Sequence, residues 1–97
     1  MNNDELARVL KALAVPSRLR IVGLLRSHPL CVRALTTQLD ISQPAVSQHL
    51  AVLKRAGLVD ARKEGTMVHY RVNAKRYQAA INALGVVGAA RSRKHTG

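Results

Sequence analysis

The chain has 97 residues, with 16 lysines and arginines against 5 aspartates and glutamates and a formal net charge of +11. This length fits one small domain, and a single cysteine excludes an intrachain disulfide framework. No stretch resembles a signal peptide or an apolar membrane span, so membrane and secreted classes are excluded and a reducing cytoplasm is expected. The positive charge favours a polyanionic partner, and the scarcity of aromatic residues favours duplex DNA over single-stranded RNA.

Two apolar helices are expected in the first part of the chain. Asn3 or Asp4 can cap a helix over residues 5–14, whose apolar side chains recur at the spacing of one helical face. Pro16 opens a second helix over residues 17–27, whose wide apolar arc predicts a core helix. The apolar face of the first helix needs a cover, which a second copy of the chain can supply.

The next elements have the arrangement of a helix-turn-helix. A short helix over residues 32–39 is followed by residues 40–41, which leave room only for a tight turn. Ser42 is then a good N-cap, Pro44 fits a first helical turn, and Gly57 is a natural residue just past the C-terminus. The second helix of the pair is therefore marked at both ends.

The outer face of this second helix suits a major groove. Successive residues about 100° apart turn the apolar side chains inward and leave an outer strip of Pro44, Ser47, Gln48, Ala51 and Arg55. A glutamine amide can pair with adenine, a serine hydroxyl with several base edges, and alanine permits close approach. The strip predicts base reading, and a solvated polar face that touches nothing is the alternative.

Beyond this helix the sequence alternates between apolar and polar residues, which is typical of strands. Residues 58–62 and 66–72 are the expected strands, and residues 63–65 join them as a hairpin. The hairpin carries the cations Arg62, Lys63 and Arg71. It is predicted to be a wing that lies along the phosphate backbone, with a surface hairpin of incidental charge as the alternative.

The chain is expected to dimerise through its terminal helices. Asn73 can cap a last helix over residues 74–85, whose apolar stripe, like that of the first helix, lacks a cover. The predicted interface comprises Leu6, Val9, Leu10, Leu13, Tyr77, Ile81 and Leu84. The fold class is mainly α with a β-hairpin wing, a winged helix-turn-helix of four helices, two strands and a final helix. It spans residues 1–88, and a basic, mobile tail is expected over residues 89–97.

Three stretches and the wing carry a family resemblance. They are LAVPSRLRIVGLL from Leu13, LCVRAL from Leu30, ISQPAVSQHLAVLKRAGLV from Ile41, and Arg62, Glu64, Gly65, Tyr70 and Arg71 in the wing. With the pattern S-Q-x-x-V-S-x-H-L followed by A-G-L-V, the chain resembles the ArsR/SmtB family of bacterial winged helix-turn-helix repressors over residues 5–85. The resemblance implies a homodimer that covers a promoter operator and leaves it when an inducer binds.

The side chains expected to contact DNA come from the helix-turn-helix and the wing. They are Thr37, Gln38, Ser42, Gln43, Ser47, Gln48, His49, Arg62, Lys63, Thr66 and Arg71. The resemblance marks His49, but the helical wheel puts it only about 40° from the centre of the apolar arc. A hydrogen bond within the protein, for example to the wing, is therefore expected for His49 ahead of a contact with a base.

The family's metal motifs are not intact in this chain. Arsenic-responsive members of the family typically carry a C-V-C motif, whose two thiols bind the ion. This chain has Cys31, Val32 and Arg33 at these positions, and an arginine has no lone pair with which to bind a metal ion. Zinc-responsive members carry acidic and histidine ligands on the last helix, and this sequence has no histidines at i, i+4 spacing. No metal or other cofactor is expected. Cys31 is a candidate thiol sensor, with an inert, half-buried cysteine as the alternative.

Two other function classes compete with a DNA-binding regulator. A small basic RNA or ribosome-associated protein fits the charge, but the scarcity of aromatic residues and the helix-turn-helix spacing oppose it. An enzyme using Cys31 would need helpers, and the sequence shows no inferable cysteine–histidine pair, few carboxylates and no phosphate-binding loop. The sequence therefore predicts a regulator that is not an enzyme and has no membrane partner.

Overall fold

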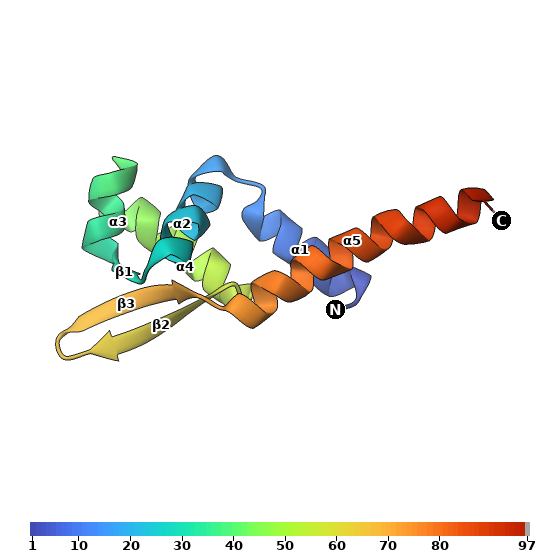
Figure 1. Cartoon of the computed structure of the whole chain (residues 1–97). Helices are drawn as coiled ribbons and strands as arrows, with labels where there is room; N and C mark the ends of the chain where they lie inside the picture. The colour runs from blue at the N-terminus through green and yellow to red at the C-terminus, as the bar shows by residue number, and fades with distance from the viewer. Residues whose placement is uncertain (97) are drawn as a thin grey trace.

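The computed structural model describes the backbone of residues 1–96 and the side chains of residues 1–87. Its elements are α1 (Asn3–Leu13), α2 (Pro16–Ser27), β1 (Leu30–Cys31), α3 (Val32–Leu39), α4 (Gln43–Arg55), β2 (Val59–Glu64), β3 (Met67–Val72) and α5 (Ala74–Thr96). In Figure 1, α2, α3 and α4 gather at one end of the molecule above the hairpin of β2 and β3, and α5 leaves the hairpin to pass α1. The winged helix-turn-helix predicted from the sequence is confirmed.

The start of α1 is set by a capping box one residue earlier than the sequence suggested. Asn2 Oδ1 accepts a hydrogen bond from the Glu5 backbone N–H at 2.8 Å, and the Asn2 backbone N–H donates to Glu5 Oε1 at 3.3 Å. The expected cap at Asn3 or Asp4 is therefore wrong. The reciprocal pair needs a glutamate three positions after the cap, and only Asn2 has one.

The tight turn between α3 and α4 has the predicted length. Asp40 ends α3 in the left-handed conformation, with φ 55°, and its N–H donates to the Thr36 carbonyl at 3.0 Å. Aspartate tolerates this conformation better than most residues. Ser42 Oγ then accepts the N–H of Ala45 at 3.2 Å and caps α4, and Gly57 takes φ 78° just beyond its end.

The sheet has three strands in the order β1-β3-β2, where the sequence predicted a two-stranded hairpin. The additional strand β1 pairs with β3 through Leu30 opposite Tyr70 and Cys31 opposite His69. The hairpin itself is confirmed, although β2 runs to Glu64 because its last residues still pair with β3. β1 joins the wing to the helix-turn-helix, since α3 begins directly after it.

One apolar core holds the helices and the sheet together. Its fully buried large side chains are Ile21, Leu35, Leu50, Leu53, Leu58, Val9, Val46 and Val59. Each such side chain contributes roughly 1.5 to 3 kcal/mol of transfer free energy. Leu6 and Val9 are 5% and 0% exposed within the protomer, so their assignment to a dimer interface is wrong. They face the chain's own core, and Leu13 and Tyr77 pack against it half-buried.

The remaining predicted interface residues do face outward. Leu10 is 40%, Ile81 46% and Leu84 51% exposed, which leaves an apolar surface along α1 and α5. α5 continues to Thr96, beyond the expected end near Gly85, and the side chains of the expected basic tail lie outside the described residues. Despite this length, no helix among the described residues is long and apolar enough to cross a bilayer.

Candidate nucleic-acid interface

α4 turns a polar face to solvent and an apolar face to the core. Its inward side chains Val46, Leu50 and Leu53 are at most 1% exposed, which fixes the rotation of the helix about its own axis. The predicted DNA contacts in the helix-turn-helix are exposed at Thr37, Gln38, Ser42, Gln43, Ser47 and Gln48. These side chains therefore lie at the protein surface, although the Thr37 hydroxyl donates to the Arg33 carbonyl and the Ser42 hydroxyl caps α4. The amides and hydroxyl of Gln43, Ser47 and Gln48 are of the kind that reads base edges.

His49 is half-buried and faces α2 rather than the wing. Its Nδ1 lies 3.4 Å from Arg18 Nη1, and Arg18 Nε donates to the Ala12 carbonyl at 2.6 Å. Because a guanidinium can only donate, Nδ1 must accept this hydrogen bond, which leaves the ring proton on Nε2. The predicted contact within the protein is confirmed, but with Arg18 as the partner. It ties α4 to the start of α2.

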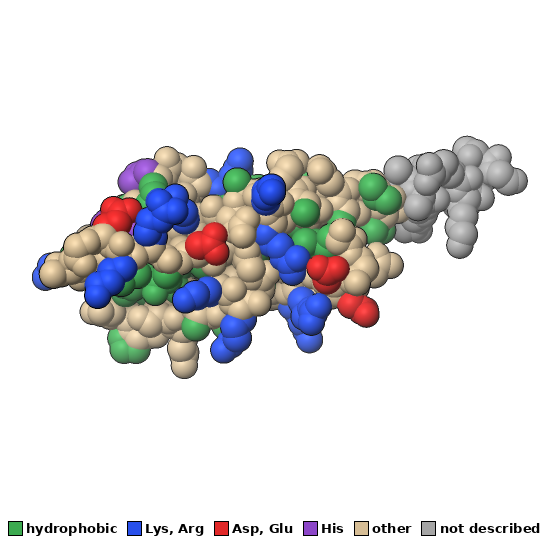
Figure 2. Space-filling view, turned by 90° about the horizontal axis from the view of Figure 1, so that it is seen from below, with side chains coloured by type: hydrophobic (Ala, Val, Ile, Leu, Met, Phe, Trp, Pro, Cys, Tyr) green, Lys and Arg blue, Asp and Glu red, His purple; other side chains and the backbone are tan. Residues whose placement is uncertain are grey.

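A hollow beside α4 gathers cations that the sequence did not single out. Arg8, Lys11, Arg18 and Arg55 line a cavity of about 360 Å³ between α1, α2 and α4. A neighbouring hollow shares Arg18 and Arg55 and is also lined by Gln48. These cations come from three separate helices, so no window of the sequence brings them together. Figure 2 shows the molecule from below the view of Figure 1. Lysines and arginines are spread widely over this face, with few acidic side chains among them.

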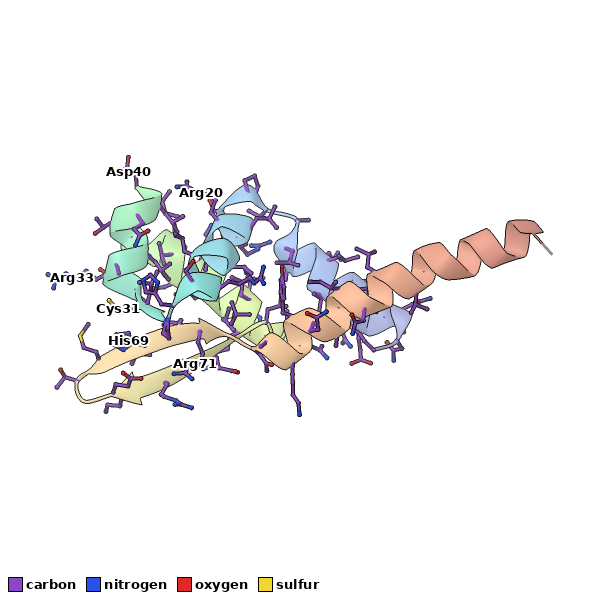
Figure 3. The ribbon with its side chains drawn as sticks, in the orientation of Figure 1. Arg20, Cys31, Arg33, Asp40, His69 and Arg71 are labelled. Carbon is purple, nitrogen blue, oxygen red and sulfur yellow. The ribbon has the colours of Figure 1, made fainter. Side chains whose placement is uncertain are left out.

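The wing presents only part of its predicted contact set. Arg62, Lys63 and Thr66 are exposed near the hairpin turn, whereas Arg71 is half-buried at the base of β3. Figure 3 shows Arg71 where β3 leads into α5, at the opposite end of the strand from the turn. Arg71 lines a cavity with residues of α2 and α5, away from the hairpin turn, and its contact with a phosphate stays a prediction.

Cys31 is half-buried on β1, directly across from His69 on β3. Figure 3 shows the two residues side by side, and His69 Nδ1 lies 3.7 Å from Glu64 Oε2. Among the residues whose side chains are described, no three His, Cys, Asp or Glu residues are placed to hold a metal ion. The role of Cys31 as a thiol sensor stays a prediction.

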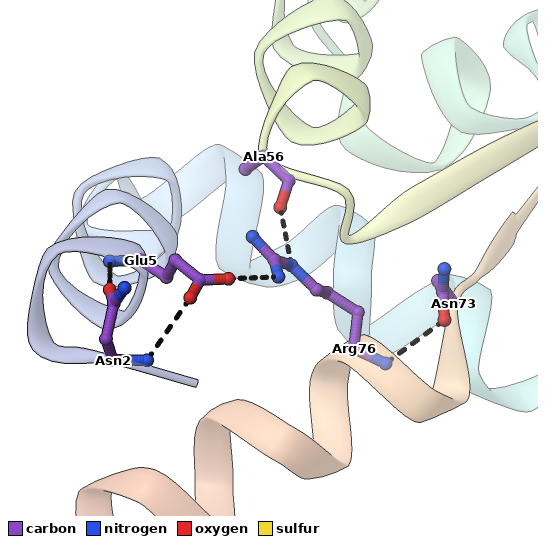
Figure 4. Close-up of polar contacts among 5 residues, drawn as sticks. All are labelled: Asn2, Glu5, Ala56, Asn73 and Arg76. Carbon is purple, nitrogen blue, oxygen red and sulfur yellow. Dashed lines mark hydrogen bonds and ion pairs between the residues drawn. The ribbon is translucent and has the colours of Figure 1, made fainter.

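Arg76 of α5 joins the two terminal helices to the end of α4 (Figure 4). Its Nε donates to the Ala56 carbonyl at 3.2 Å, and its Nη1 donates to Glu5 Oε2 at 3.2 Å. Asn73 Oδ1 accepts the Arg76 backbone N–H at 3.1 Å, which caps α5. A cation at the C-terminal end of α4 is also favoured by the helix dipole. The position of α4 is therefore tied to that of α5.

The pKa of Glu5 is lowered, first by the hydrogen bond from the Asn2 backbone and next by the one from Arg76. Because folding lowers this pKa, the contact stabilises the folded state above the ordinary carboxyl range. That stabilisation is lost as the pH falls through the lowered pKa. The link between α1 and α5 is consequently intact at neutral pH.

Comparisons with known proteins agree with this geometry. Residues 15–61 match the family model of the bacterial regulatory protein, arsR family. The chain is 41% identical to the transcriptional activator HlyU of Vibrio cholerae over 83 residues, which cover 86% of this chain and 77% of that protein. Its fold is similar to that of an ArsR-like transcriptional regulator from Rhodococcus sp. RHA1, with a TM-score of 0.89, 30% identity, and coverage of 96% of this chain and 88% of that one.

A further similar structure is the homodimeric winged helix-turn-helix DNA-binding domain of a possible ArsR-family regulator from Mycobacterium bovis. The TM-score is 0.73 at 36% identity, with 88% of this chain and 80% of that chain covered. The sequence relatives, the fold and the exposed face of α4 lead to one conclusion. The chain belongs to the ArsR family of bacterial regulatory proteins and is a transcriptional regulator with a DNA-binding winged helix-turn-helix.

Proposed function

We propose that the protein is a homodimeric repressor that binds a duplex operator, with α4 of each protomer in a major groove, until a signal releases it. The observation that carries the proposal is the exposed amide and hydroxyl face of α4. The opposite, apolar face of this helix is fully buried and fixes its orientation. Symmetric protomers would place their two α4 helices on half-sites about one helical turn apart. Binding would then exclude other proteins from the promoter.

The contacts divide into base reading and backbone positioning. Gln43, Ser47 and Gln48 are assigned to base edges because they are exposed on α4. The phosphate contacts are assigned to Thr37, Gln38, Ser42, Arg62, Lys63 and Thr66, with Arg8, Lys11 and Arg55 from the hollow beside α4. His49 is assigned to holding α4 against Arg18.

The dimer is supported by the uncovered apolar surface of the terminal helices. Leu10, Ile81 and Leu84 are each at least 40% exposed in the protomer. Large exposed apolar side chains on two helices that contact each other are typical of a protein interface. The similar domain from Mycobacterium bovis is homodimeric.

A binding assay with the duplex upstream of the protein's own coding sequence tests the function. The protein is expected to shift this duplex at concentrations well below those needed for random duplex or for single-stranded RNA of the same length. Equal affinity for all three would identify a general polyanion binder and contradict the repressor proposal.

Gln48→Ala is expected to weaken binding to the best operator by about 1 to 3 kcal/mol and to relax the preference at one base pair in each half-site. The reason is the removal of an exposed amide at the centre of the α4 face. Titration of single-base operator variants measures both effects. Asn82→Ala removes an exposed amide from α5 and serves as the control. An equal decrease in affinity for operator and random duplex would remove Gln48 from the base-reading set.

Replacing Arg62 and Lys63 by alanine is expected to weaken all duplex sequences similarly. The slope of log affinity against log salt concentration should flatten by about 0.9 for each phosphate that the wing no longer neutralises. Binding to operator and random duplex over a range of salt concentrations measures the slope. The control removes the same charge from two exposed positions off the wing, Arg33 and Lys75. An unchanged slope in the wing variant would mean that the hairpin does not contact the backbone.

A further inference from the structure

We propose that the cavity where α2, β3 and α5 meet is a binding site for a small organic anion. The cavity has a volume of about 440 Å³, which is within the range of small-molecule sites. The regulatory role of this site rests on the operator-binding function proposed above. The binding of an anion to the cavity does not depend on that function.

The polar lining is cationic. Arg26 and His28 come from the end of α2, Arg71 from the base of β3, and Tyr77 and Gln78 from the first turns of α5. No aspartate or glutamate is among the described residues that line the cavity. Two guanidinium groups and neutral donors therefore converge with no carboxylate in the lining to neutralise them, which favours a ligand with acceptor oxygens and negative charge.

Among the described residues, Arg71 has neither a hydrogen-bond acceptor for its Nε nor an ion-pair partner. Its Nε is buried without a hydrogen-bond acceptor among the described side chains and backbone. Asp60 is its neighbour across β2 and β3, yet no ion pair joins them in the part of the chain described here. A buried charged donor is costly when unpaired, and an oxyanion in the cavity that Arg71 lines would compensate the charge of its guanidinium group.

Arg26 is held in place by an aromatic ring. Its guanidinium carbon lies 4.8 Å from the centroid of the Tyr77 ring, which is a cation–π contact between α2 and α5. The N-terminal end of α5 adds positive partial charge to the cavity, and the C-terminal end of α2 adds negative partial charge. These partial charges offset each other, so the full charges of Arg26 and Arg71 make the electrostatic potential in the cavity positive.

Apart from Ser27, the rest of the lining is apolar, which sets the class of ligand. Leu25, Pro29 and Val72 form much of the wall. A bare inorganic ion would leave these surfaces uncovered, whereas an anion with an apolar body would cover them. The geometry thus fits a carboxylate or phosphate group attached to a small hydrocarbon or aromatic body.

A DNA phosphate is the other source of an oxyanion, and the position of the cavity disfavours it. No residue of α4 lines the cavity, whereas Arg18 and Arg55 line the hollow beside α4. The cavity instead touches β3 of the wing and α5, the helix that carries the exposed apolar surface. A ligand here contacts both elements and is placed to couple its own binding to that of the operator.

The test is calorimetric titration of the full-length protein, without DNA, with phenyl phosphate as the probe. Phenyl phosphate is expected to bind once per protomer, with inorganic phosphate and phenol each binding at least about tenfold more weakly. Arg71→Gln and, separately, the exposed Arg26→Gln should each weaken phenyl phosphate binding by about tenfold. Lys75→Gln removes the same charge from an exposed α5 position outside the cavity and should change the affinity less than about twofold.

Several results would overturn the site. They are no binding of phenyl phosphate at millimolar concentration, equal weakening by Lys75→Gln, or equal affinity for inorganic phosphate. A decrease in affinity for random duplex in Arg71→Gln as large as that in the wing variant would assign the cavity to DNA phosphate instead. Circular dichroism of each variant confirms folding, and Arg26→Gln keeps the test valid if Arg71→Gln unfolds.

The regulatory part is tested separately by operator titration with and without saturating phenyl phosphate. The bound dianion offsets the charge of Arg26 and Arg71, so operator affinity is expected to fall. By reciprocity, operator binding must lower the affinity for phenyl phosphate by the same factor. Unchanged operator affinity would overturn the effector role, and failure to bind any operator would overturn the proposed function while leaving the calorimetric result intact.

Discussion

Replacing Leu10 and Ile81 together by aspartate is expected to give folded monomers that no longer bind the operator tightly. Both side chains are at least 40% exposed in the protomer, so the substitutions leave its core intact. At a dimer contact the same carboxylates would be buried without partners. This costs roughly 3 kcal/mol or more, which is about a hundredfold or more in the dissociation constant of the dimer. Sedimentation velocity measures the assembly state.

The matched control for this variant is Leu19→Asp. Leu19 is a leucine on α2 that is 55% exposed and lies outside the apolar surface of the terminal helices. It should leave the assembly state unchanged. If the double variant sediments as a folded dimer, the interface lies elsewhere on the protomer.

Leu50→Ala is expected to lower the free energy of unfolding by about 2 to 5 kcal/mol, a large part of the stability of a small domain. Leu50 is 1% exposed and holds the inner face of α4 in the core. The cavity left by the substitution would also loosen α4, so operator affinity should fall although no DNA contact is removed. Urea denaturation at a fixed protein concentration measures the change, because stability is linked to dimerisation.

Leu19→Ala makes the same chemical change at an exposed position and should cost about 0.5 kcal/mol or less. A decrease below about 1 kcal/mol for Leu50→Ala would contradict the role of the buried face in anchoring α4. If the Leu50→Ala protein were strongly destabilised but bound the operator with full affinity, the position of α4 would not depend on the packing of Leu50.

The helix-turn-helix could be predicted because its signals are local. Ser42 and Gly57 act on backbone within a few residues of themselves, so a short window of sequence contains the cause of each helix end. β1 could not be predicted in this way. Its two residues carry no periodicity, and its hydrogen-bond partners Tyr70 and His69 lie about 40 positions along the chain.

Periodicity showed which side of each terminal helix is apolar but not what covers it. Val9 and Leu10 are neighbours on one apolar arc, yet Val9 is fully buried in the protomer and Leu10 is 40% exposed. The same limit applies to Arg71, since alternation gives the face of β3 but not the helices that pack beside its base. The hollow lined by Arg8 and Arg55 is likewise a product of tertiary packing.

The contact of Arg76 with Glu5 also has a consequence for the order of folding. The two residues are 71 positions apart, whereas the helix-turn-helix and the hairpin are built from near neighbours. Closing so long a loop is entropically costly, so local elements are expected to form first and this contact last. Stopped-flow measurements on Arg76→Met should therefore show faster unfolding and an almost unchanged refolding rate. The part of each protomer that reads DNA would be assembled before α1 and α5 dock, and a newly made chain would acquire its pairing surface only at the end of folding.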